Sequence, residues 1–77
     1  MNYKTDTKMI RKKMIDKGIK TISGLAGLTG ISKNTLGKVL NGETQPSSEV
    51  MYKLASYLEI SPTEAGVIFF SRNLRNA

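Results

Sequence analysis

Apolar side chains recur at helical spacing in two segments of the chain. The first segment, about 6–17, carries them at Met9, Ile10, Met14 and Ile15. The second segment, about 48–58, carries them at Val50, Met51, Leu54, Ala55 and Leu58. Side chains three and four positions apart lie on the same side of a helix, so the pattern predicts a helix with one buried face over each segment.

Residues that start and stop helices predict three shorter helices. Hydroxyl side chains suited to capping stand at Thr21, Ser32 and Ser61, ahead of expected helices at 22–28, 33–40 and 62–70. The last of these starts is the strongest, because a proline and a glutamate follow the serine at the first and third helical positions. The apolar run 67–70 also suits a β-strand, which remains an alternative for the end of the last helix.

Together these elements predict one all-α domain of five helices over the 77 residues, with 71–77 as a flexible tail. The helices 22–28 and 33–40, joined through Gly30, predict a helix-turn-helix over about 22–41. In this motif the small Ala26 permits a close crossing of the two helices. The expected shared core consists of Leu25, Ile31, Leu36 and Val39, and Leu28 is also expected to pack against a neighbouring element.

The distribution of charge is more informative than the net charge of +6. The stretch 17–42 contains four lysines and no carboxylate, which suits contact with a polyanion, although lysines also keep a small surface soluble. We interpret Lys12, Lys13 and Lys17 as a solvated face of the first helix. The chain has no cysteine and no histidine, and we expect no enzyme activity, metal or cofactor. No segment is long and apolar enough to be expected in a membrane.

One face of the helix 33–40 carries no apolar side chain. Its residues are Lys33, Asn34, Gly37 and Lys38, with Thr35 at the edge. The opposite face holds the apolar positions that we expect to pack against the preceding helix. The polar face is therefore available for contact with another molecule.

Residues 25–47 resemble the Cro/CI-type (XRE-like) helix-turn-helix family of phage repressors and related bacterial regulators. The matching positions are Leu25, Ala26, Thr29, Gly30, Ile31, Ser32, Thr35, Leu36, Val39, Asn41, Gly42, Pro46 and Ser47. With the first helix and the segment 53–61, the similarity covers about 9–65. Two features depart from the family: Ile22 stands where a glutamine is frequent, and the stretch 18–30 is one residue longer.

The resemblance implies a compact, lambda-repressor-like fold whose helix 33–40 enters the major groove of DNA. The implied base contacts are Lys33, Asn34, Thr35, Gly37 and Lys38. The implied contacts with the DNA backbone are Ser32, Asn41, Thr44 and Ser47. Two alternatives stay open: Ser32 and Ser47 are also suited to capping helices, and Gly37 either lets the bases approach or allows close packing of helices.

The implied function is that of a cytoplasmic transcriptional repressor of the Cro-like phage or prophage kind, which binds a palindromic double-stranded DNA operator as a homodimer. The expected dimer or partner interface is Val67, Ile68, Phe69 and Phe70, because one helix face does not bury four consecutive apolar residues. Alternatively, two of the four complete the core and two contact solvent. Other functions that remain open are a modulator that binds a second repressor and the antitoxin of a toxin–antitoxin pair.

Overall fold

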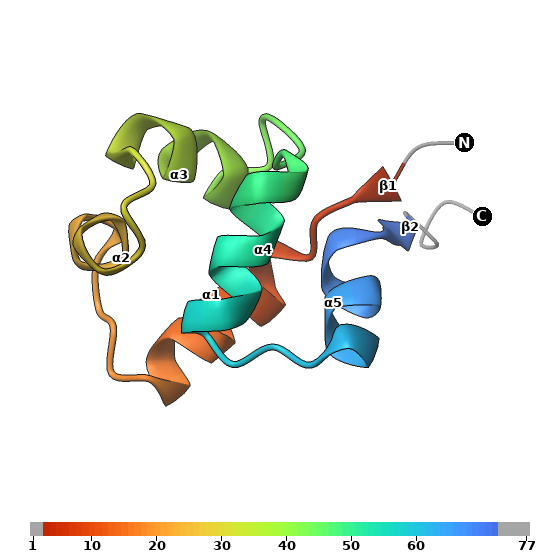
Figure 1. Cartoon of the computed structure of the whole chain (residues 1–77). Helices are drawn as coiled ribbons and strands as arrows, with labels where there is room; N and C mark the ends of the chain where they lie inside the picture. Colours follow the sequence, from red (N-terminus) through yellow and green to blue (C-terminus); the bar gives the residue numbers. More distant parts are fainter. Residues whose placement is uncertain (1–2, 73–77) are drawn as a thin grey trace.

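The computed structural model describes residues 3–72 and contains five helices, as the sequence predicts, and a short two-stranded ribbon (Figure 1). The helices are α1 (Thr7–Asp16), α2 (Ile22–Thr29), α3 (Lys33–Leu40), α4 (Ser48–Tyr57) and α5 (Pro62–Phe69). The strands are β1 (Tyr3–Lys4) and β2 (Ser71–Arg72). The expected all-α fold is confirmed, and the run 67–70 is helical through Phe69 rather than a strand.

A side chain caps the start of every helix. The capping residues, each accepting a hydrogen bond from the backbone N–H three positions later, are Asp6, Thr21, Ser32, Ser47 and Ser61. At α5 the serine and Glu64 form a reciprocal capping box, as their spacing predicts. Each cap satisfies an amide that has no partner within its helix, so the helix boundaries follow directly from local chemistry.

The core lies where α1, α3, α4 and α5 meet, closed on one side by α2. Its buried apolar side chains are Ile10, Met14, Leu25, Ile31, Leu36, Leu40, Leu54, Leu58, Ile60, Ile68 and Phe69. The four residues expected to join α2 to α3 are all buried. Among residues 3–72, no helix has the length and apolar character needed to cross a membrane.

Two apolar residues lie outside the core, against expectation. Ile15 is 73% exposed, because it lies roughly 140° around the helix from Ile10 while Met14 lies directly one turn beyond Ile10. Leu28 is 48% exposed, because α2 turns Leu25 and Thr29 toward the core and Leu28 lies beside that face. Both were predicted to pack, and both predictions are wrong.

The strand β1, at the start of the described residues, is fastened to α5 and to the strand β2 that follows it. β1 and β2 pair antiparallel, with Tyr3 opposite Arg72 and Lys4 opposite Ser71. The Asp6 N–H donates to the Ile68 carbonyl at 2.7 Å. The expectation of a tail beginning at 71 is therefore wrong for 71 and 72, and 73–77 lie outside the described residues. Two-residue strands have too little periodicity for a sequence pattern to reveal them.

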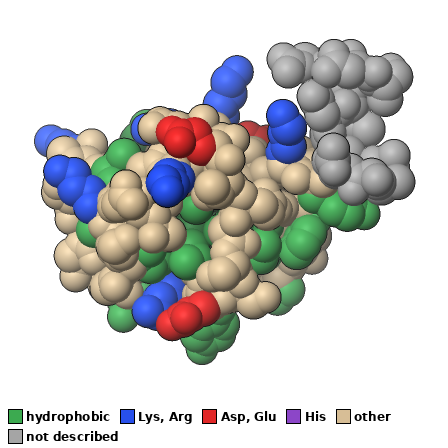
Figure 2. All heavy atoms as spheres, turned by 90° about the horizontal axis from the view of Figure 1, so that it is seen from above, with side chains coloured by type: hydrophobic (Ala, Val, Ile, Leu, Met, Phe, Trp, Pro, Cys, Tyr) green, Lys and Arg blue, Asp and Glu red, His purple; other side chains and the backbone are tan. Residues whose placement is uncertain are grey.

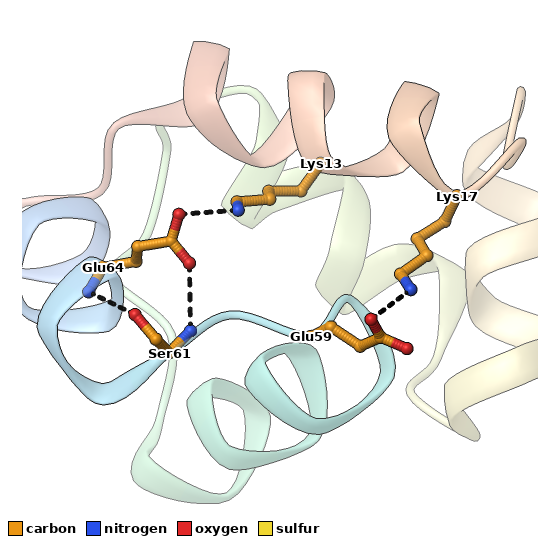
Figure 3. A network of polar contacts seen from close by, with 5 residues as sticks. All are labelled: Lys13, Lys17, Glu59, Ser61 and Glu64. Atoms are coloured by element: carbon orange, nitrogen blue, oxygen red, sulfur yellow. Dashed lines mark hydrogen bonds and ion pairs between the residues drawn. The ribbon is translucent and has the colours of Figure 1, made fainter.

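Ion pairs attach α1 and its C-cap residue to the first turn of α5 and to the loop before it (Figure 3). Lys13 Nζ lies 2.7 Å from a carboxylate oxygen of Glu64, and Lys17 Nζ lies 2.6 Å from one of Glu59. The hydrogen bonds to these lysines lower the pKa of both carboxyl groups below its ordinary value. The sequence pattern predicted a solvated face that includes Lys13 and Lys17. Both lysines instead form ion pairs with residues far along the chain.

Candidate nucleic-acid interface

The turn between α2 and α3 is held by one buried side chain. Thr29 Oγ1 donates to the Leu25 carbonyl at 2.8 Å and accepts from the Ile31 N–H at 3.2 Å. Gly30 follows with φ of 78°, a conformation that costs a residue with a side chain about 1 kcal/mol or more. The hydroxyl and the glycine together fix the angle at which α3 leaves α2. The sequence identified the glycine but not the role of the threonine.

α3 divides cleanly into a buried face and an exposed face. Leu36, Val39 and Leu40 are buried in the core, which fixes the rotation of the helix about its axis. Lys33, Asn34 and Lys38 are consequently exposed on the opposite side. Thr35 is half-buried at the edge, where its hydroxyl accepts from Ser32 Oγ at 2.8 Å.

The exposed face of α3 borders a shallow hollow. The hollow is lined by Lys33, Asn34, Gly37, Lys38, Asn41 and Glu43. A Cβ atom placed on Gly37 would meet no atom of another element within 4 Å. The alternative that Gly37 permits close packing of helices is therefore wrong, and the glycine adds no side chain to the lining of the hollow.

The hollow has a basic rim. Within residues 3–72, neither Lys33 nor Lys38 has an ion-pair partner, whereas Lys13, Lys17 and Lys53 each pair with a glutamate. Figure 2 shows the molecule from above, the side on which α3 lies in Figure 1, with blue lysine and arginine side chains spread across it and red carboxylates among them. Unpaired ammonium groups beside an exposed amide are chemically suited to phosphates and to base edges.

A comparison with protein families agrees with this geometry. The model of the Cro/C1-type HTH DNA-binding domain matches residues 9–67, from α1 to near the end of α5. The chain belongs to the Cro/C1-type helix-turn-helix DNA-binding family. Comparison with curated proteins and with solved structures found no match.

The first helix of the helix-turn-helix, α2, begins at Ile22. It does so although Ile22 replaces the frequent glutamine and the stretch 18–30 is one residue longer than is usual in the family. Thr21 accepts from the Gly24 N–H at 2.9 Å and so sets the start of α2. Family membership establishes DNA binding, while the individual contacts of α3 with bases stay predictions.

The residues predicted to contact the DNA backbone surround α3 but have different local roles. The hydroxyls of Ser32 and Ser47 accept the capping hydrogen bonds of α3 and α4. Asn41 lines the hollow, and Thr44 is exposed in the loop that follows. A capping hydroxyl can still donate its own proton, so the cap and the predicted phosphate contact are compatible for Ser47.

The apolar run at the end of α5 is split by the helix. Ile68 and Phe69 are buried in the core of the single chain, so they are not available for an interface. Val67 and Phe70 are 54% and 50% exposed. The Phe70 ring meets the Tyr3 ring edge to face, with centroids 5.8 Å apart. The structure thus agrees with the alternative in which two of the four residues complete the core.

Proposed function

We propose that the protein is a sequence-specific transcriptional repressor that works in the cytoplasm and binds a palindromic operator as a homodimer, as Cro-like phage or prophage repressors do. The observation that carries this proposal is the exposed polar face of α3, which the core holds in one orientation and which is hollowed at Gly37. A rigid helix presenting donors and acceptors is the element that the major groove accommodates.

The side chains on this face match the groups that bases display. Lys33 and Asn34 occupy the first two positions of α3, and its N-terminal end is the part that a recognition helix points toward the bases. A lysine can donate to O6 and N7 of guanine, and an asparagine can pair with N6 and N7 of adenine. Lys38, one turn further along, can contact a base or a phosphate.

Dimerisation is supported by surface that remains apolar in the single chain. Tyr3, Val67 and Phe70 are each about half exposed and lie at the joined ends of the described chain. One helix contacts only a few base pairs, and helix-turn-helix proteins reach specific affinity by placing two recognition helices about 34 Å apart. A second copy on this surface would supply the other helix.

The first experiment selects bound duplexes from a random pool and sequences them. We expect a two-fold symmetric motif, because a symmetric dimer contacts equivalent half-sites. Asn34→Ala should weaken binding to the selected duplex by about 1–3 kcal/mol while leaving random DNA unchanged. Alanine has a higher helix propensity than asparagine, so folding is preserved. Lys12→Ala, which removes an exposed lysine of α1, is the control for a non-specific loss of charge.

A second measurement tests the interface by sedimentation of the wild-type chain and of Phe70→Asp. We expect the variant to be monomeric and to bind the selected duplex more weakly, since a carboxylate in an apolar interface is costly. If neither Lys33 nor Asn34 affects DNA binding, while Phe70 is needed to bind another regulator or a toxin, the protein is a modulator or an antitoxin instead.

A further inference from the structure

The hollow on the exposed face of α3 includes one carboxylate that the helix itself does not carry. Glu43 lines the same hollow as Lys33, Asn34, Gly37 and Lys38. Glu43 is exposed, and it is the first acidic residue after the stretch 17–42, which contains four lysines and no carboxylate. In the described part of the chain, no lysine or arginine pairs with it.

The backbone holds Glu43 firmly against the end of α3. Gly42 adopts a left-handed φ of 77° and donates its N–H to the Val39 carbonyl at 3.1 Å. The Glu43 N–H then donates to the Lys38 carbonyl at 2.8 Å. This pair of hydrogen bonds is the Schellman arrangement, which ties the residues after a helix to its last turn. The backbone of Glu43 therefore has a fixed place after the last turn of α3, and its exposed side chain lines the hollow beside the predicted base contacts.

A carboxylate at this place opposes binding to DNA in general. Phosphates surround the groove, and a negative charge brought near them raises the free energy of every complex. The repulsion is compensated only where the DNA offers a hydrogen-bond donor to the carboxylate. In the major groove the donors are the amino groups N4 of cytosine and N6 of adenine.

We propose that Glu43 is a specificity-determining residue that accepts a hydrogen bond from a base amino group and disfavours duplexes that offer none at that position. This inference rests on the proposed function, because it requires α3 to lie in the major groove. Lys33 and Asn34 select by attraction, whereas Glu43 selects mainly by raising the free energy of the wrong complexes.

The test compares wild type with Glu43→Gln, Glu43→Asp and Glu49→Gln on the selected duplex and on a random duplex. Glu43→Gln removes the charge and keeps the length of the side chain, so we expect about three- to tenfold tighter binding to random DNA. Binding to the selected duplex should stay unchanged or weaken, so that the ratio of the two affinities falls by about threefold or more. A glutamine can still pair with N6 and N7 of adenine, so selection with this variant should replace a preference for cytosine by one for adenine at one position of each half-site, while the affinity ratio falls in either case.

The other two variants separate charge from hydrogen bonding. Glu43→Asp keeps the charge but shortens the reach, so it should weaken binding to the selected duplex and leave random DNA unchanged. Glu49→Gln removes a carboxylate of α4 that lies 3.5 Å from Lys53 and outside the hollow. It should change both affinities slightly and equally.

The results distinguish failure of this inference from failure of the proposed function. If wild type selects a motif and Glu43→Gln selects the same motif with the same affinity ratio, Glu43 has no role in specificity. An equal gain on both duplexes also overturns the inference, because it shows repulsion without selection. If wild type selects no motif at all, the proposed function fails, and the inference fails with it.

Discussion

Replacement of Gly37 by alanine should have opposite effects on the free protein and on its complex with DNA. Gly37 is the fifth of the eight residues of α3, and glycine inside a helix is about 0.8–1 kcal/mol less favourable than alanine. A Cβ at this position meets no atom of another element within 4 Å, so no steric clash offsets the increase in the free energy of unfolding that alanine provides. A gain of this size raises the melting temperature of a small domain by roughly 4–8 °C.

If α3 lies in the major groove as proposed, the added methyl group lies between the α3 backbone and the bases. A displaced helix loses contacts, and one good pair of hydrogen bonds to a base contributes about 1–3 kcal/mol. Binding to the selected duplex should therefore weaken about five- to 150-fold. Thermal unfolding measures the first effect, and a fluorescence titration at fixed salt concentration measures the second.

Gly27→Ala in α2 is the matched control. Its Cβ also meets open space, but Gly27 does not line the hollow. It should stabilise the protein by a similar amount and leave DNA affinity unchanged. If the Gly37→Ala variant is more stable than wild type but binds DNA equally well, α3 does not approach the bases closely at this position. A variant that is less stable would refute the argument from open space.

Two further predictions concern stability. The hydrogen bond from Lys13 lowers the pKa of the Glu64 carboxyl group in the folded protein below its ordinary value of 4.5. The ionised Glu64 therefore contributes its full stabilisation above about pH 4.5, and this stabilisation is lost as the pH falls through the lowered pKa. Urea unfolding should therefore show Glu64→Gln less stable than wild type at pH 7, with the difference reduced at pH 3; an unchanged difference would contradict the ion pair. Thr29→Val should cost about 1–3 kcal/mol, because it leaves the buried Ile31 N–H without a partner. Thr29→Ser, which keeps the hydroxyl, should retain more of this stability in the same urea titration, and equal losses would argue against the hydrogen bond.

The exposed face of α3 could be predicted from the sequence because it depends only on helix capping and on the spacing of apolar residues within the helix. Ser32 caps α3 and Leu36 and Val39 fall on one side of it, so the polar residues necessarily occupy the other side. Glu43 was missed for a different reason. It lies outside the helix in a loop, and only the left-handed Gly42 and the hydrogen bond to the Lys38 carbonyl return it to the hollow.

Capping and helical periodicity act over three or four residues, so local patterns were enough to predict five helices, the helix-turn-helix and the polar face of α3. Which apolar residues stay outside the core depends on how the helices pack against one another. Val67 and Ile68 are chemically alike, yet one is exposed and the other buried, because the packing of α5 against α1 and α4 sets the rotation of the helix. The β1–β2 ribbon and the pairing of Lys13 with Glu64 also join residues far apart along the chain, and periodicity carries no information about such contacts.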